Sequence, residues 1–137
     1  MAGVCSGVVN LKEQDSSMCG LAGVYAFTEI GASSLELLPA ASAALAHRGP
    51  DAKGAFRKGK VGMVHTRLSI IDPSAFANQP FTDASGRYTI VLNGEIFNYR
   101  KLRDELASKG CRFSTESDTE VVLQLYIREG QECLKRL

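Results

Sequence analysis

A pair of short extended runs constrains the fold of this chain more than any other feature. Residues 54–71 divide into two arms that meet at Lys58-Gly59, and two such arms around a glycine turn predict a β-hairpin. An apolar run at 21–27 predicts a buried strand, and a β-rich run at 88–92 predicts another that stops at Asn93-Gly94. Paired strands within a mixed order of helices and strands favour a layered α+β fold.

Three segments predict helices. An Ala/Leu-rich stretch is expected to begin close to Pro39, since proline is tolerated only in a helix's first turn. Asn98 can cap a second helix, which Gly110 closes. Residues 117–120 read Ser-Asp-Thr-Glu, a capping box for a third helix that is expected to stop at Gly130.

The charge balance excludes several classes of partner. Sixteen Lys and Arg against fifteen Asp and Glu leave a formal net charge of +1, and the charges are scattered along the chain. That pattern gives no electrostatic footprint for nucleic acid or an anionic membrane. No apolar stretch approaches bilayer length, and residues 1–17 lack the basic start and apolar run of a secretion signal. We therefore expect a cytoplasmic protein with no nucleic-acid or membrane partner.

The cysteines and histidines give no sign of a metal site. The cysteines stand at Cys5, Cys19, Cys111 and Cys133, without the close pairs that zinc sites use. Without a secretory context, a disulfide framework is not expected either. Nothing supplies a third ligand near His47 or His65, so both are interpreted as structural.

Six motifs follow one another along the chain. They are Met18-Cys19-Gly20-Leu21-Ala22-Gly23-Val24, His47-Arg48-Gly49-Pro50-Asp51 with Gly54, His65-Thr66-Arg67-Leu68-Ser69-Ile70-Ile71-Asp72, Gln79-Pro80, Asn93-Gly94-Glu95-Ile96-Phe97-Asn98 and Ser117-Asp118-Thr119-Glu120-Val121. Together they resemble the glutaminase domain of asparagine synthetases, a class II glutamine amidotransferase with an N-terminal nucleophile. The second and third motifs look more like asparagine synthetases or their β-lactam-forming relatives than like sugar-phosphate or phosphoribosyl amidotransferases.

The resemblance implies a fold and a domain division. It implies the α+β architecture of Ntn hydrolases, an αββα four-layer sandwich, which we expect to be C-terminally truncated at Leu137. Residues 1–18 would be a leader or propeptide, and residues 19–137 the N-terminal part of a type 2 glutamine amidotransferase domain. ATP and Mg²⁺ would belong only to a synthetase domain that this sequence lacks, because no Gly-rich phosphate-binding loop occurs in it. No cofactor is expected in the glutaminase part.

Cys19 is the implied nucleophile. A thiol is the strongest nucleophile that side chains offer near neutral pH. In the family this cysteine is the first residue of the mature chain, and its α-amine, with a pKa of about 7.7, can accept the proton. The expected reaction forms a γ-glutamyl thioester on Cys19 and releases ammonia from L-glutamine. A synthetase domain would use that ammonia for ATP-dependent amide formation.

The remaining site residues also follow from the resemblance. The Asn93 side chain and the Gly94 N–H would stabilise the oxyanion, although Asn-Gly alone also suits a plain hairpin turn. Arg67 would bind the α-carboxylate of glutamine and Asp118 its α-ammonium. Arg67 could instead be a surface arginine flanking a strand, and Asp118 is also favoured by the helix dipole alone. Further pocket residues would be Ile70, Ile71 and Glu95.

Two rival interpretations stay open at the level of sequence. If the amine of Cys19 is held in a peptide bond, it has no useful basicity, and the chain would be a non-catalytic glutamine-binding regulatory domain. The second rival is an inert fragment. The acceptor of the ammonia cannot be read from these residues, and a homo-oligomer is neither indicated nor excluded.

Overall fold

The structure of the chain, a computed structural model, describes residues 18–137. The strands are β1 (Gly20–Tyr25), β2 (Ala52–Lys58), β3 (Val61–Arg67), β4 (Phe81–Thr82) and β5 (Thr89–Ile90). The α-helices are α1 (Glu29–Ala32), α2 (Leu38–Ala44), α3 (Tyr99–Ser108) and α4 (Asp118–Glu129), and 3₁₀ helices occupy Ser33–Leu37, Ala75–Ala77 and Gly130–Arg136. This mixture of helices and antiparallel strands is compatible with the predicted α+β class.

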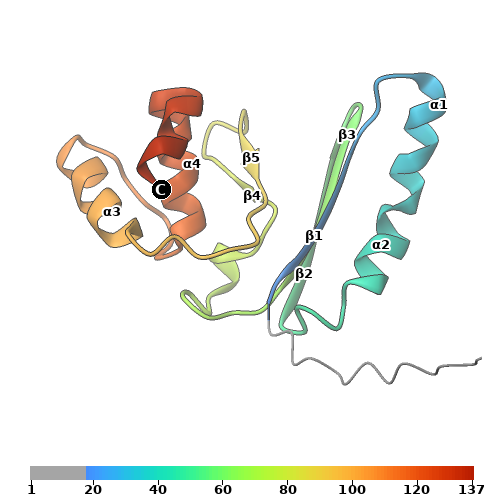
Figure 1. Cartoon of the computed structure of the whole chain (residues 1–137), viewed down its shortest axis with the longest axis horizontal. Helices are drawn as coiled ribbons and strands as arrows, with labels where there is room; N and C mark the ends of the chain where they lie inside the picture. The colour runs from blue at the N-terminus through green and yellow to red at the C-terminus, as the bar shows by residue number, and fades with distance from the viewer. Residues whose placement is uncertain (1–17) are drawn as a thin grey trace, which may run out of the picture.

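Three strands form an antiparallel sheet in the order β1-β3-β2. The predicted hairpin is confirmed as β2 and β3, and its turn contains Gly59 with a φ of 57°. Figure 1 shows α2 running along one face of this sheet. Leu35, Leu38 and Val64 are buried between them. Pro39 lies in the first turn of α2, as predicted.

The second half of the chain lies on the other side of the sheet from α2 and contains α3, α4 and the β4-β5 pair (Figure 1). Its core is formed mainly by Leu102, Leu106, Val121 and Leu125. The predicted strand at 88–92 is too long, since only Thr89–Ile90 pairs with β4. Pairing ends there because the Leu92 N–H donates to a side-chain oxygen of Gln79, at 2.5 Å.

The helix boundaries follow the predictions more closely than the caps do. Ser117 caps α4 by accepting from the Thr119 N–H at 3.0 Å, and Gly130 ends the helix with a φ of 60°. The second bond of the predicted capping box, from the Ser117 N–H to the Glu120 carboxylate, is wrong. That carboxylate binds residues 114–115 instead. Asn98 precedes α3 but does not cap it; its amide donates to the Arg136 carbonyl at 2.7 Å.

The described residues also bear on the thiols, on metal binding and on membrane spans. Cys19, Cys111 and Cys133 are free thiols, while Cys5 and residues 1–17 of the expected leader lie outside the described residues. Within 18–137, no group of three or more His, Cys, Asp or Glu side chains could hold a metal ion. No helix in this range has the length and apolar character needed to cross a bilayer.

Candidate active site

The end of the β1-β3 pair positions the thiol of Cys19. Gly20 pairs with Thr66, so Cys19 lies beside the residues that follow β3. The Leu68 N–H donates to the Cys19 sulfur at 3.3 Å, and the Leu68 carbonyl is 3.6 Å from the same atom. Nε of Arg48 donates to the Cys19 carbonyl at 3.2 Å. The thiol is half-buried and is held by main-chain groups.

The segment from Gly49 to Asp51 closes this end of the sheet. Pro50 bridges to Arg67 in a parallel arrangement, and a Cβ on Gly49 would lie 2.3 Å from the Thr66 carbonyl carbon. The Asp51 carboxylate accepts from the Ser69 N–H at 2.7 Å. A side chain at position 49 would therefore push apart the strand end that places Cys19.

Arg67 is the last residue of β3 and is only 7% exposed, so the alternative of a surface arginine is wrong. Its Nη1 donates to the Ser74 carbonyl at 2.8 Å and to Oδ1 of Asn78 at 2.7 Å. Its Nη2 donates to the Asp72 carbonyl. The guanidinium thus stabilises the loop after β3 through three hydrogen bonds.

Asn93 and Gly94 lie in the segment after β5. They do not join two paired strands among the described residues, because β5 pairs with the preceding β4. The alternative of a plain hairpin turn at Asn93-Gly94 is therefore wrong. Gln79 anchors the start of this segment: its Oε1 accepts from Leu92, and its Nε2 donates to the Thr119 hydroxyl at 3.1 Å.

Asp118 is the first residue of α4 and is 6% exposed. Its Oδ2 accepts from the Ile96 N–H at 3.1 Å, which ties the Asn93–Ile96 segment to the start of the helix. The helix dipole favours a carboxylate at this position. Asp118 therefore supports the neighbouring loop in addition to any contact with a ligand.

These elements enclose a cavity of about 280 Å³. Every site residue predicted from the sequence lines it, namely Cys19, Arg67, Ile70, Ile71, Asn93, Gly94, Glu95 and Asp118. The volume is near the lower end for small-molecule sites, which suits a ligand about the size of an amino acid. One cavity thus combines a thiol, a buried cation and carboxylates.

Several lining residues were missed by the sequence reasoning. They are Met18, Leu68, Asp72, Ala77, Gln79, Leu92, Ser117 and Thr119. Six of them occur inside the motifs quoted above, and that was the signal that could have found them: Met18, Leu68, Asp72, Gln79, Ser117 and Thr119. Leu68 and Leu92 take part through their main-chain N–H groups, which no side-chain pattern reveals.

Comparison with known proteins gives the family. Residues 18–137 match the glutamine amidotransferase domain family. The chain belongs to this family. The amidotransferase domain is 41% identical over 122 residues to the glutamine-hydrolysing asparagine synthetase 1 of Bacillus subtilis (strain 168), covering 88% of this chain and 19% of that protein. It is 37% identical over 124 residues to the glutamine-hydrolysing asparagine synthetase B of Escherichia coli (strain K12), covering 88% and 21%.

A relative with a different name matches a shorter part of the amidotransferase domain. The amidase chry2 of Gibberella zeae is 42% identical over 95 residues, which is 68% of this chain and 14% of that protein. The chain therefore spans about one fifth or less of the length of these relatives. The resemblance inferred from the six motifs is confirmed by the family match.

Two titratable groups of the amidotransferase domain have shifted pKa values near the cavity. Hydrogen bonding from the Ser74 side chain, opposed by burial and reinforced by the Glu116 N–H, lowers the pKa of Asp72. Burial lowers the pKa of His65, and the Leu92 backbone offsets a smaller part of that change. His65 is fully buried in β3, and Nδ1 of the exposed His47 lies 2.9 Å from the Ala44 carbonyl.

Proposed function

We propose that this domain is the glutaminase part of an asparagine-synthetase-like amidotransferase. It would hydrolyse L-glutamine and supply ammonia to a synthetase domain. The observation that carries the proposal is the cavity into which Cys19, Arg67 and Asp118 converge from separate parts of the chain. A thiol beside a cation and an anion matches the amide, the α-carboxylate and the α-ammonium of one glutamine molecule.

The reaction begins at the Cys19 sulfur. The thiolate attacks the side-chain amide carbon of glutamine, and the carbonyl oxygen becomes an oxyanion. When the C–N bond breaks, the nitrogen takes a proton and leaves as ammonia, and a γ-glutamyl thioester remains. Water then hydrolyses the thioester to glutamate and restores the thiol. The Leu68 N–H, 3.3 Å from the sulfur, helps to hold a thiolate in place.

Asn93 and Gly94 are the proposed donors to the oxyanion. Both residues line the cavity, and an added Cβ at Gly94 would meet nothing within 4 Å. Loss of one such donor raises the barrier by about 3–4 kcal/mol in other enzymes. Gln79 and Asp118 brace the two ends of this segment, so the donors are preorganised before substrate arrives.

Arg67 is the proposed partner of the α-carboxylate. A guanidinium carries five N–H groups, and the described residues of this chain take up three of those of Arg67. The two that remain, on Nε and Nη2, suit a two-pronged bond to a carboxylate. Asp118, with Glu95 nearby, would receive the α-ammonium, and Ile70 and Ile71 would contact the aliphatic part of the substrate.

The α-amine of Cys19 is the proposed base, so the proposal includes removal of residues 1–18 as a leader or propeptide. Met18 also lines the cavity beside Cys19. A free amine has a pKa of about 7.7 and is partly deprotonated at neutral pH, whereas a peptide nitrogen has no basicity. Glutaminase activity is thus expected only from a chain that begins at Cys19.

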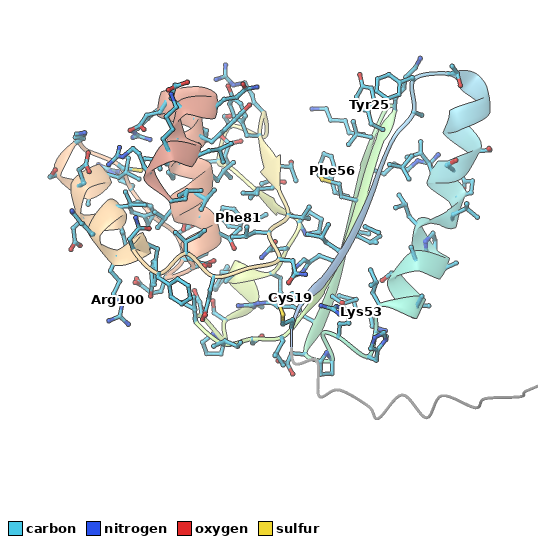
Figure 2. All side chains as sticks on the ribbon, in the orientation of Figure 1. Cys19, Tyr25, Lys53, Phe56, Phe81 and Arg100 are labelled. Atoms are coloured by element: carbon cyan, nitrogen blue, oxygen red, sulfur yellow. The ribbon has the colours of Figure 1, made fainter. Side chains whose placement is uncertain are left out.

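The finer architecture is also a proposal. The face of the sheet opposite α2 carries Leu21, Tyr25 and Phe56, and Tyr25 is 60% exposed. Figure 2 shows Tyr25 and Phe56 pointing away from α2, toward the half of the molecule that holds Phe81. A second sheet packed on this apolar face would complete the αββα sandwich. A synthetase domain with ATP and Mg²⁺ and a cytoplasmic location complete this proposal.

The test is a Cys19→Ala substitution in the full protein as its host produces it. Glutamine-dependent amide formation should be lost, while formation from added ammonium salt should persist at the wild-type rate. Cys111→Ala, which removes a thiol from the helical core, is the matched control and should keep both activities. Glutamine use by the Cys19→Ala protein would refute the assignment of the nucleophile.

A further inference from the structure

Recognition of glutamine, the proposed function on which this inference rests, imposes a geometric demand. The α-carboxylate and α-ammonium are attached to the same carbon, so their protein partners must lie at a fixed separation. Arg67 belongs to β3 and Asp118 to α4, which come from different halves of the fold. The structure must therefore contain a connection that holds these two halves at that separation.

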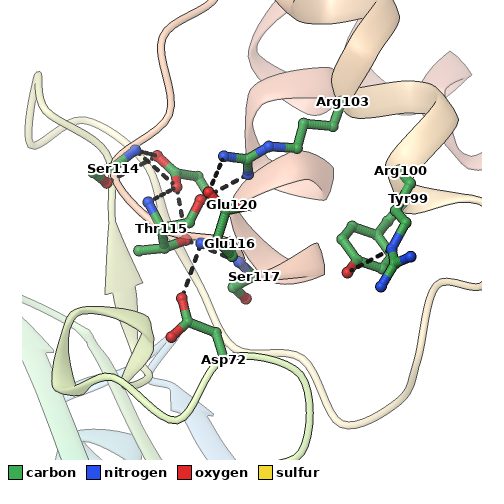
Figure 3. Close-up of polar contacts among 9 residues, drawn as sticks. All are labelled: Asp72, Tyr99, Arg100, Arg103, Ser114, Thr115, Glu116, Ser117 and Glu120. Atoms are coloured by element: carbon green, nitrogen blue, oxygen red, sulfur yellow. Dashed lines mark hydrogen bonds and ion pairs between the residues drawn. The ribbon is translucent and has the colours of Figure 1, made fainter.

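Asp72 makes this connection. Its carbonyl accepts from Nη2 of Arg67, which ties it to the cationic side of the cavity. Its Oδ2 accepts from the Glu116 N–H at 2.9 Å, two residues before Asp118 (Figure 3). Its Oδ1 accepts from the Ser74 N–H at 2.9 Å. The residue is 7% exposed, so solvent replaces these contacts poorly.

The partner of Asp72 on the α4 side is itself firmly held. Figure 3 shows the Glu120 carboxylate turned back onto Ser114 and Thr115. It accepts from the N–H and hydroxyl groups of both residues at 2.7–3.1 Å. Nη1 of Arg103 donates to the Thr115 carbonyl at 2.7 Å. The Glu116 N–H thus belongs to a firmly held segment that leads into α4, and a shift there would move Asp118.

We propose that Asp72 is a positioning residue that sets the separation between the charges of Arg67 and Asp118. Its carboxylate oxygens accept hydrogen bonds from main-chain N–H groups, so Asp72 acts through Arg67 and Asp118. The consequence is specificity for a ligand that carries both α-charges. A ligand with only one of them can bind to either partner without needing their separation.

The measurement is protection of the Cys19 thiol from iodoacetamide in the full chain, followed by mass spectrometry of the Cys19 peptide. The protection constant is the ligand concentration that halves the rate of alkylation, so a higher constant means weaker binding. It is determined for glutamine, for glutaramate, which lacks the ammonium, and for 4-aminobutanamide, which lacks the carboxylate. In Asp72→Asn one acceptor oxygen becomes an NH₂ group that cannot accept. The protection constant of the Asp72→Asn protein for glutamine should rise about tenfold or more, while its constants for the two analogues should change less than about threefold.

Asp83→Asn is the matched control. Asp83 also accepts main-chain N–H bonds, from Ser85 and Tyr88 at 2.9 Å, but in the β4-β5 turn away from the cavity. Asp83→Asn should leave all three protection constants unchanged. Asp72→Glu, which keeps the charge and moves the oxygens by one methylene, should repeat the Asp72→Asn pattern if the asparagine variant does not fold.

The outcomes separate the inference from the proposed function. If glutamine does not protect Cys19 in the wild-type chain, the proposed function fails. If glutamine protects the wild type, but Asp72→Asn shifts all three constants equally or none of them, Asp72 is only structural and the inference is overturned. Reactivity of the Cys111 peptide in the same samples reports whether the fold is intact, because that thiol is buried.

Discussion

Replacing Glu120 with glutamine should destabilise the fold by about 2–4 kcal/mol. The Glu120 side chain is 3% exposed, and its two oxygens satisfy four donors on Ser114 and Thr115. In the amide, an NH₂ group replaces one oxygen. The Thr115 hydroxyl can rotate to accept from that group, but the Thr115 N–H cannot. One buried N–H without a partner costs about 1–3 kcal/mol, and the loss of charge at the remaining bonds adds about 1 kcal/mol.

Flipping the amide rescues the variant only in part: the NH₂ group then faces the Ser114 N–H, which loses its bond of 2.9 Å and keeps only the longer one of 3.1 Å to the other oxygen. Urea unfolding followed by circular dichroism or tyrosine fluorescence measures the change; the chain has four tyrosines and no tryptophan. With a slope of about 2 kcal/mol per M, the midpoint should fall by about 1–2 M.

The control for this prediction is Glu116→Gln in the same loop. Glu116 pairs with Nη2 of Arg103 at 3.0 Å, but its side chain is 78% exposed. An exposed ion pair contributes about 0–1 kcal/mol, so Glu116→Gln should move the midpoint little. Equal midpoints for the Glu120→Gln and Glu116→Gln proteins would refute the argument that Glu120 satisfies buried donors.

Two further predictions concern the glycines and the buried histidine. Gly54→Ala should lower the urea midpoint strongly, because the added Cβ would lie 2.0 Å from the Gln79 carbonyl oxygen. Gly94→Ala should leave the midpoint unchanged, since its Cβ would meet nothing within 4 Å. Comparable midpoints for the two variants would contradict this prediction. Burial lowers the pKa of His65 in the folded state, so the unfolded state binds the proton first and stability should fall as pH drops below about 6.5. His65→Gln should flatten that fall in urea midpoints measured between about pH 5 and pH 7.5, and an unchanged slope would exclude His65 as its source.

Local features of the fold could be predicted because local physics determines them. The turn of the β2-β3 hairpin requires a positive φ at Gly59, and the start of α4 needs a Ser117 oxygen, so neighbouring residues were sufficient. The failed cap at Asn98 has its partner far away in sequence. Asn98 donates to Arg136, 38 residues later. No periodicity or propensity at Asn98 contains information about Arg136, so the sequence predicted the helix boundary but not the bond.

The candidate site also divides into features that the sequence predicts and contacts that it does not. The motif resemblance named eight residues that the fold brings into one cavity, although Cys19 and Asp118 are far apart in the chain. It did not reveal how they are held there. Asp72 reaches across 44 residues to a main-chain N–H, and Gln79 reaches across 40 to a hydroxyl. Such bonds depend on how the two halves pack, which is decided only when the chain folds.

The contact between the Cys19 sulfur and the Leu68 N–H affects how this domain can diverge over evolution. Every amino acid except proline offers the same N–H at that position, so the support of the thiol does not depend on the identity of residue 68. Leu68 lines the cavity, so a different side chain at this position would change the shape of the wall. The pocket can thus be adapted to new substrates at this position by single substitutions, with the sulfur still held by the same main-chain group.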